Sequence, residues 1–540
     1  MTAPTSTHPD DQLSIALGFL AIVRRARRHA RARVGSAEVS EGHIILVAGA
    51  LLAGALGASV LAARAHLPVL LLFIAVGMTV GSDGTGWVVF NNYETAQSVG
   101  TVALALILFE GGLSAGLATI RPVLGAAFRL GILGTAITAL LGGMAAAFLF
   151  GLRPVYGLLL GSILASTDTA AVFGLLRGSP LRKRIGRTLE AEAGLNDPVA
   201  VLLVIGFIHW IQRPDFGAAD MVILFARQLG IGALSGMLFG WAGAEALRRV
   251  RLEPSGLYPV ASLAVAALSF GGAEVFGGSG FLAVYLAGLA LGAPSVPDGR
   301  ALRVFHSGVS WLAQVTLFLM LGLLVNPAQL GSVAADAIVL AAVILFVARP
   351  AAVMLATVFE RFSVNERLLL AWAGLRGAVP VVLATYPVTE GVPQAGRFFE
   401  IAFFTVVIST LVQGTTFEPL ARKLGQLERP RRGRDERTRV GGRIPPLVTQ
   451  LWSIRHDDPA EPREVDGTNV SRRLATREGV AGALVELDDG RCAVTGPSMA
   501  VGSARQINRY ARRRLEDTND VAETRWWAGV LDALDGAAVS

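Results

Sequence analysis

The feature of this sequence that most restricts its fold is a nearly continuous series of long apolar stretches between His43 and Leu420. A helix needs about 20 apolar residues to cross the hydrocarbon core of a bilayer, and by that criterion we expect about thirteen spans. The expected spans are 43–64, 66–82, 96–116, 122–150, 155–177, 187–211, 219–247, 256–276, 278–296, 308–326, 333–358, 366–388 and 398–420. The sequence therefore predicts an all-α polytopic membrane protein.

The composition agrees with a chain that is embedded in a lipid bilayer. Of the 540 residues, 53% are hydrophobic and 16% are charged, whereas a soluble domain carries about 25% charge. Cys492 is the only cysteine, which excludes a disulfide framework and a cysteine metal site. The sequence has no zinc signature and no nucleophile elbow, so we expect neither an intramembrane enzyme nor a cofactor.

Arginine and lysine are unequally distributed between alternate loops, and positively charged loops stay in the cytoplasm. One set of loops holds Arg64, Arg121, Arg177, Arg182, Lys183, Arg184, Arg187, Arg248, Arg249, Arg251, Arg300, Arg303, Arg361 and Arg367. The other set holds only Arg153, Arg213 and Arg397. This asymmetry predicts a cytoplasmic C-terminus.

Some ionisable side chains fall inside the expected spans, where they are costly and mark ion or proton paths by default. They are Glu110, Asp168, Glu190, Glu192, Asp197 and Arg376. Glu274, Asp336 and Arg349 lie near span ends, where we expect their long side chains to reach the interface.

The fifth expected span contains the polar run "ILASTDTAAVF", residues 163–173, with Ser166, Thr167, Asp168 and Thr169 in succession. A helix that unwinds there frees backbone carbonyls, and transporters use such breaks near the bilayer midplane to hold ions. Oxygen ligands suit hard cations. We therefore expect a cation site at this run.

The sixth expected span contains "EAGLNDPVA", residues 192–200. Pro198 follows Asn196 and Asp197 and disturbs the helical hydrogen bonds, while Glu192 shares a helix face with Asn196. Burial disfavours the charged form of a carboxylate, so a proton and a cation can compete for Asp197. A structural ion pair with an arginine is the alternative role for this aspartate.

Four motifs in order, "LILFEGGLS" (106–114), "STDTAAVF", "EAGLNDPVAV" and "LAWAGLRGAVPVVLA" (370–384), resemble the NhaP-type branch of the monovalent cation:proton antiporter-1 family. The likeness is close to its bacterial potassium/proton antiporters and runs from about residue 43 to 425. It implies two inverted repeats with broken crossing helices. It also implies a homodimer in the bacterial cytoplasmic membrane that exposes one carboxylate to each side in turn.

The resemblance assigns roles to single residues. Asp197 matches the carboxylate that binds either cation or proton, and Asn196 matches the asparagine of electroneutral members. Thr167 and Asp168 match the pair on the broken helix that contributes to the ion site, so the monovalent cation is expected at Asp197 and Asp168. Glu110 matches an acidic position near that site.

Glu192 and Arg376 match a glutamate and an arginine that form a structural ion pair between helices. Two positions depart from the family pattern. Thr169 replaces a frequent proline after the Thr-Asp pair, which makes unwinding there less secure. Ala193 replaces a frequent serine, so one hydroxyl ligand for the cation is missing.

These residues predict a secondary antiporter that exchanges a monovalent cation for protons by alternating access without net charge transfer, in pH and cation homeostasis, and the resemblance favours potassium as the cation. Its partners would be potassium or sodium ions, protons, the lipid bilayer and a second copy of the chain, with no nucleic acid. A sodium/proton antiporter of the same fold is one alternative. A cation channel is another, although a channel pore needs rings of carbonyls or charges along a path.

Beyond the spans the composition changes. We divide the chain into an arginine-rich extension (1–42), a transmembrane exchanger domain (43–425), a charged linker (426–446) and a small α+β cytoplasmic domain (447–540). In the last part, Asp488-Asp489-Gly490 between two apolar runs predicts a β-hairpin. This domain is expected to be regulatory, a dimer contact or a cap.

Overall fold

The chain divides into two compact units, residues 1–427 and 428–540. The structure, a computed structural model, describes residues 41–427 apart from 66–67, 83, 89, 169–180, 251–255, 294 and 326. Beyond residue 427 it describes five strands and a few short pieces. Residues 1–40 of the arginine-rich extension, Thr169 and the charged linker after Leu427 lie outside the described residues.

The described part of the first unit is helical. Its α-helices are α2 (Glu41–Ala65), α3 (Val69–Val80), α4 (Tyr93–Ala115), α5 (Leu117–Ile120), α6 (Leu124–Arg129), α7 (Thr135–Phe150), α8 (Pro154–Ile163), α10 (Lys183–Gln212), α11 (Ala218–Arg249), α12 (Leu257–Val275), α13 (Gly280–Leu291), α14 (Gly299–Leu324), α15 (Pro327–Val343), α16 (Arg349–Ala356), α17 (Val364–Trp372), α18 (Ala378–Thr389) and α19 (Ala395–Lys423). A 3₁₀ turn, η1 (Arg121–Val123), precedes α6, and π turns η2 (Leu130–Gly134) and η3 (Ile344–Ala348) join α6 to α7 and α15 to α16.

The expected polytopic helical architecture is confirmed. Within the described ranges, nine helical segments are long and apolar enough to cross a membrane. Four shorter apolar helices, α3, α8, α13 and α18, coincide with the second, fifth, ninth and twelfth expected spans. Two of these four, α8 and α18, are short because the chain unwinds next to them.

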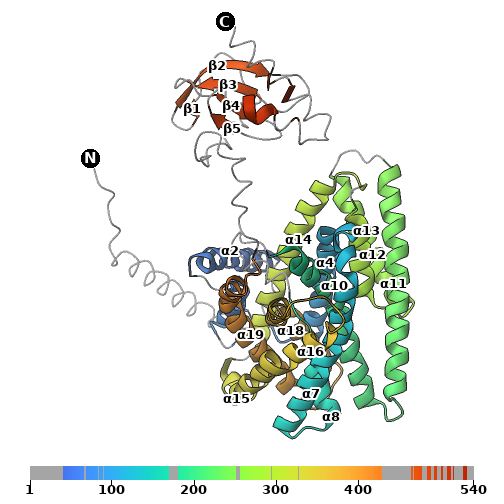
Figure 1. The fold of residues 1–540 in the computed structure, drawn as a ribbon. Helices are drawn as coiled ribbons and strands as arrows, with labels where there is room; N and C mark the ends of the chain where they lie inside the picture. The colour runs from blue at the N-terminus through green and yellow to red at the C-terminus, as the bar shows by residue number, and fades with distance from the viewer. Residues whose placement is uncertain are drawn as a thin grey trace. The chain divides into compact units, whose positions relative to one another are not determined.

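The helices pack as two groups (Figure 1). In one group α13 packs against α4, α11 and α12, and α14 packs against α3 and α4. In the other, α7 packs against α8, α10 packs against α8, and α19 packs against α15 and α18. We call the first the α4–α14 group; it contains α3, α4, α11, α12, α13 and α14. We call the second the α8–α19 group; it contains α7, α8, α10, α15, α18 and α19. Contacts of α4 with α10 and α18 join them.

Glycines set the close approaches within each group. A Cβ at Gly288 of α13 would overlap the backbone carbonyl of Phe109 on α4. A Cβ at Gly161 of α8 would overlap the carbonyl of Ala139 on α7 and would lie 2.6 Å from the Gly143 Cα. Small residues allow helix backbones to pack closely where no water drives association.

Two helices in the α8–α19 group are interrupted near one another. The helix α8 ends at Ile163, and residues 164–168 are not helical. The helix α17 ends at Trp372, and α18 begins only at Ala378. The Asp168 amide N–H donates to the Leu375 carbonyl at 2.7 Å, so the two unwound segments meet. The unwinding expected at Ser166–Asp168 is thus present.

Side chains of α19 satisfy the unwound backbone of residues 372–377. The Gln413 amide donates to the Trp372 carbonyl at 2.8 Å, and the Thr410 hydroxyl donates to the Arg376 carbonyl at 2.8 Å. The Ser409 hydroxyl accepts the Arg376 amide N–H at 3.4 Å. Non-helical backbone at membrane depth requires such internal partners because lipid offers none.

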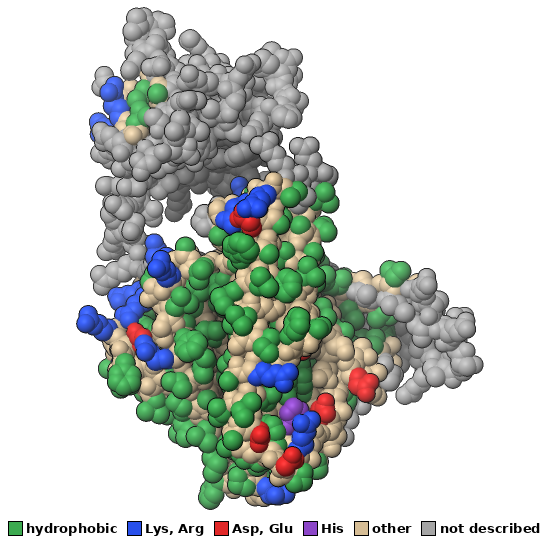
Figure 2. Space-filling view, turned by 90° about the vertical axis from the view of Figure 1, so that its right-hand side faces the viewer, with side chains coloured by type: hydrophobic (Ala, Val, Ile, Leu, Met, Phe, Trp, Pro, Cys, Tyr) green, Lys and Arg blue, Asp and Glu red, His purple; other side chains and the backbone are tan. Residues whose placement is uncertain are grey.

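The outer surface of the helical unit is apolar. On α11, Leu234, Met237, Leu238 and Trp241 are all more than half exposed. Figure 2 shows this face as mostly hydrophobic, with few charged side chains. Such a surface suits lipid, or another helix in lipid, and not water.

The second unit contains a five-stranded antiparallel sheet in the order β1-β2-β3-β4-β5. The strands are β1 (Glu464–Val465), β2 (Thr468–Thr476), β3 (Ala483–Leu487), β4 (Cys492–Thr495) and β5 (Ala500–Gly502). The pairing of β3 with β4 confirms the strands of the expected hairpin. Its turn, at residues 488–491, lies outside the described residues.

We predict that Gly161→Ala destabilises the helical unit, because the new methyl group meets backbone atoms of α7 that cannot move aside. Overpacking of this kind costs about 1–3 kcal/mol. Thermal unfolding of the purified protein in detergent measures the effect. Gly271→Ala on α12, where a Cβ meets nothing within 4 Å, is the control and should leave the unfolding temperature unchanged or slightly raised. Equal unfolding temperatures for the two variants would contradict the close packing of α7 and α8.

Candidate functional site: a cavity between the two helix groups

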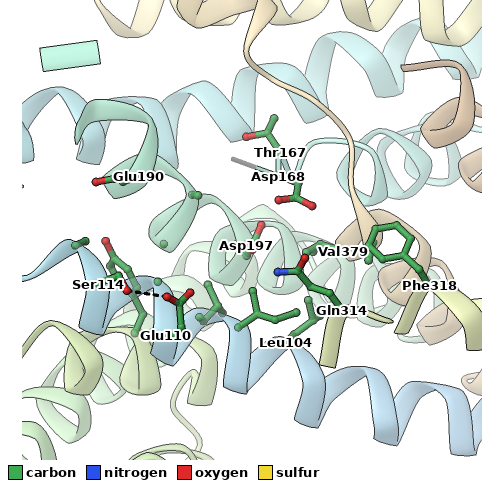
Figure 3. Close-up of a pocket in the computed structure, with 18 residues that line it drawn as sticks. Leu104, Glu110, Ser114, Thr167, Asp168, Glu190, Asp197, Gln314, Phe318 and Val379 are labelled. Carbon is green, nitrogen blue, oxygen red and sulfur yellow. Dashed lines mark hydrogen bonds between the residues drawn. The ribbon is translucent and has the colours of Figure 1, made fainter. Parts of the chain in front are cut away.

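A cavity of about 240 Å³ lies where the α4–α14 group faces the α8–α19 group (Figure 3). One wall belongs to α4, α13 and α14 and carries the polar side chains of Glu110, Ser114, Tyr285 and Gln314. The opposite wall belongs to the unwound segment after α8 and to α10, and it carries Thr167, Asp168, Glu190 and Asp197. Segments that are far apart in sequence therefore place four carboxylates, those of Glu110, Asp168, Glu190 and Asp197, on the wall of one cavity.

Asp197 lies on the cavity wall in the second turn after Glu190 and is 9% exposed. The Ser166 hydroxyl, in the unwound segment after α8, donates to Asp197 Oδ1 at 2.5 Å. Pro198, inside α10, has no N–H to donate to the Gly194 carbonyl. The aspartate thus sits among oxygen atoms that are not committed to a regular helix.

Asn196 ties α10 to the same unwound segment. Its amide nitrogen donates to the Thr167 hydroxyl at 2.6 Å and to the Thr167 carbonyl at 3.2 Å. The side-chain oxygen of Asn196 is buried and has no hydrogen-bond partner among the described residues. Asn196 therefore holds the break in place with its nitrogen and presents its oxygen to the interior of the protein.

Asp168 lies against the start of α18. A Cβ at Gly377, the N-cap of α18, would overlap the Asp168 carboxylate, so only a glycine allows this approach. The positive end of a helix macrodipole stabilises a negative charge at its N-terminus. The two aspartates of the cavity thus differ in environment: Asp168 faces a helix N-terminus, whereas Asp197 is held by one serine hydroxyl.

Glu110 and Glu190 mark the other end of the cavity, away from Asp197 and Asp168 (Figure 3). The Ser114 hydroxyl, one turn along α4, donates to Glu110 Oε1 at 2.7 Å. Glu190, Ala193, Gly194 and Asp197 have the spacing of one helix face, so a single face of α10 lines the cavity from end to end.

The expected ion pair between Glu192 and Arg376 is wrong in its partner. Glu192 Oε1 accepts from Arg349 Nη2 at 2.5 Å, and both side chains are almost completely buried. Arg349 follows the π turn η3 and points into the protein, so it does not reach the interface as we expected from its place in the sequence. Sequence spacing does not show that α16 packs beside the break at Gly374, where the Arg349 guanidinium lies.

Arg376 is also buried but serves the backbone. Its Nη1 donates to the Gly374 carbonyl at 3.1 Å, while its Nε and Nη2 have no hydrogen-bond partner among the described residues. Gly374 contacts Arg349 as well. Two arginines and Glu192 therefore form one buried cluster behind the unwound segment.

Sequence reasoning named Ser166 in the polar run without giving it a role of its own, and it missed Tyr285 and Gln314. Ser166 stands beside the Thr-Asp pair, and its place in that polar run was the available signal. It supplies the hydroxyl contact to Asp197, whereas Ala193 lines the cavity without one. Tyr285 and Gln314 lie in apolar stretches and gave no signal, because only the packing of α13 and α14 turns them toward the cavity.

The residues around Asp197 offer oxygen atoms from carboxylate, hydroxyl and carbonyl groups, which suit a hard cation. Among the residues that the structure describes, no group of three or more His, Cys, Asp or Glu side chains is placed to hold a metal ion.

A helical membrane protein whose interrupted helices meet beside a buried carboxylate has the architecture of a secondary transporter. The model of the transmembrane sodium/hydrogen exchanger family matches residues 47–423. The chain belongs to this family, which is one of transporters and not of enzymes.

Its relatives include proteins described as K(+)/H(+) antiporters and one described as a Na(+)/H(+) antiporter. A K(+)/H(+) antiporter NhaP2 of Shewanella sp. (strain MR-4) is 40% identical over 375 residues, which is 69% of this chain and 65% of that protein. A K(+)/H(+) antiporter NhaP of Alkalimonas amylolytica is 38% identical over 398 residues, 73% of this chain and 69% of that one. A Na(+)/H(+) antiporter NhaH of Halobacillus dabanensis is 31% identical over 323 residues, 57% of this chain and 77% of that one. The chain thus spans less than two thirds of the length of the Shewanella relative.

The fold is similar to a solved structure. That of the sodium proton antiporter MjNhaP1 from Methanocaldococcus jannaschii superposes with a TM-score of 0.61 at 22% sequence identity. The superposition covers 71% of this chain and 99% of that one. At this identity the likeness supports the fold of the helical unit.

We predict that Glu192 is coupled more strongly to Arg349 than to Arg376. Removing one partner of a buried pair leaves an uncompensated charge and costs about 3–5 kcal/mol. Two double-mutant cycles, Glu192→Gln with Arg349→Met and Glu192→Gln with Arg376→Met, measured by unfolding in detergent, compare the two couplings. A larger coupling to Arg376 would show that the pair seen in the structure is not the stable one.

Proposed function

We propose that the protein is a secondary antiporter that exchanges a monovalent cation, preferably potassium, for protons across a membrane. The observation that carries this proposal is the position of Asp197: buried, on a helix with an internal proline, and bonded by Ser166 of an unwound segment at the wall of a cavity. Membership of the sodium/hydrogen exchanger family supports the same class of activity. The relatives described as K(+)/H(+) antiporters support potassium.

In this proposal the cation and the proton compete for the carboxylate of Asp197. Burial disfavours an empty charged carboxylate, so the site changes sides only when it carries a proton or a cation. Asp168 and the Thr167 and Ser166 hydroxyls offer further oxygen ligands, and Glu110 lies on the route to them. Asn196 is neutral and holds the broken helix, so one proton exchanges for one cation and no net charge crosses.

The arrangement of the chain supports alternating access between two inverted repeats. One interrupted helix, α8, follows the α6–η2–α7 segment and precedes α10; the other, α17–α18, follows α15–η3–α16 and precedes α19. The cavity separates these segments from the α4–α14 group, and we propose that the α8–α19 group moves against it. The exposed apolar face of α11 suits lipid or a second copy of the chain, consistent with a homodimer in the bacterial cytoplasmic membrane.

Asp197→Asn should abolish exchange, because a neutral amide cannot hold either the proton or the cation in turn. Purified protein in liposomes with an imposed pH gradient and an internal pH dye measures this when potassium or sodium is added. Asp336→Asn is the matched control: its carboxylate pairs with Arg397 at 2.7 Å at a partly exposed position, where such a pair adds little. Exchange by Asp197→Asn at the rate of the wild type would refute the proposed role of Asp197.

Electroneutral exchange predicts that the potassium-driven pH change is independent of membrane potential. A potassium gradient with valinomycin would itself drive the proposed exchange, so the membrane potential is set instead with a gradient of a permeant anion such as thiocyanate, at equal potassium gradients. The initial rate should be the same at an inside-negative and a zero potential. A rate that changes with potential, or a current proportional to transport, would overturn the proposed stoichiometry, and a non-saturating current would favour a channel.

A further inference from the structure

The aromatic ring of Tyr285 divides the cavity into two ends. A Cβ at Gly194 on α10 would overlap Cζ and Cε2 of this ring, so the hydroxyl end of Tyr285 rests directly on Gly194. Gly194 lies between Glu190 and Asp197 on the cavity-lining face of α10, with about 6 Å of helix rise on one side and about 4.5 Å on the other. Tyr285 thus stands between the Glu110–Glu190 end and the Asp197–Asp168 end.

The hydroxyl of Tyr285 is buried and lacks a partner. The residue is 2% exposed, lines the cavity, and its oxygen has no hydrogen-bond partner among the described residues. A buried hydroxyl without a partner is rare because it loses its hydrogen bonds to water without replacement. The missing partner of the Tyr285 hydroxyl is explained if a ligand binds to it transiently.

The backbone of Tyr285 belongs to the wall opposite α10. A Cβ at Gly112 of α4 would overlap the Tyr285 carbonyl, so α13 and α4 pack tightly at this level. Glu110 of α4 and Glu190 of α10 line the same cavity as Tyr285. Because the lining face of α10 carries Glu190, Gly194 and Asp197 in this order, the Tyr285 ring on Gly194 lies between the glutamate end and Asp197.

We propose that Tyr285 is a specificity-determining residue of the antiporter, whose hydroxyl oxygen is a ligand for the partly dehydrated monovalent cation on its way between the two glutamates and Asp197. A phenolic oxygen accepts a hard cation as other neutral oxygens do. The Gly194 carbonyl lies one turn before Pro198 on α10. Because Pro198 has no N–H to donate to it, this carbonyl offers a second neutral oxygen. This inference rests on the proposed antiport function.

Tyr285→Phe tests the hydroxyl alone, because the ring that packs on Gly194 remains. In liposomes, the half-saturating concentration of potassium should rise about five- to tenfold, the effect of losing one neutral polar contact, at an unchanged maximal rate. The ratio of the half-saturating concentrations of potassium and sodium should also change. Tyr156→Phe is the matched control, because Tyr156 packs near Phe398 outside the cavity-lining residues, and it should behave as the wild type.

Two results would overturn the proposal: wild-type half-saturation for both ions in Tyr285→Phe, or a lower maximal rate with unchanged half-saturation, which would assign the hydroxyl to proton transfer or to movement. Wild type and Asp197→Asn are measured in the same liposomes. Absence of exchange in the wild type would refute the antiport function itself. A failure of that function is therefore distinguishable from a failure of the Tyr285 proposal.

The contact that places Tyr285 can be tested independently by stability. Gly194→Ala should lower the unfolding temperature in detergent, because its methyl group displaces the ring, and this loss should be smaller in a Tyr285→Ala background. An equal loss in both backgrounds would mean that the ring does not rest on Gly194, and the proposal would lose its geometric basis.

Discussion

The structure depends on backbone that is unwound inside the membrane and nevertheless hydrogen-bonded. The segments after α8 and between α17 and α18 meet through the Asp168 amide and the Leu375 carbonyl. Lipid offers no hydrogen bonds, so every exposed backbone group must find a partner in the protein. The side chains of α19 and of Asn196 supply these partners, and in doing so they fix where the carboxylates lie.

The buried charged side chains also need partners within the protein, because lipid offers none. Asp168 faces the N-terminus of α18, which stabilises its negative charge. Glu192 takes Arg349 as its partner behind the break, and Arg376 bonds to the backbone of the unwound segment. Asp197 is left with a single serine hydroxyl and the cavity. Glu192, Arg349 and Arg376 thus serve the structure behind the break, whereas Asp197 lies on the cavity wall beside the unwound segment, and the proposed exchange is assigned to it.

The cavity gives these local features a direction. One face of α10 carries Glu190, Gly194 and Asp197 in succession, and Tyr285 of the opposite wall rests on the glycine between the two acids. A glycine at 194 is required because the ring occupies the volume of its side chain. If α10 moves against α13 during transport, as we propose, this contact is the one that must slide or open.

The sequence by itself determined the helical membrane fold, because hydrophobic length is a local signal. Polar residues in apolar runs are also local signals, and they predicted the unwinding at Ser166–Asp168 and a role in ion binding for Asn196 and Asp197. The tertiary structure decided which arginine pairs with Glu192, how Ser166 reaches Asp197, and that Tyr285 and Gln314 line the cavity. These contacts join residues on different helices, such as Glu192 and Arg349, which are 157 positions apart. The packing angle and rotation of each helix select such partners, and neither is encoded in the spacing of a single span.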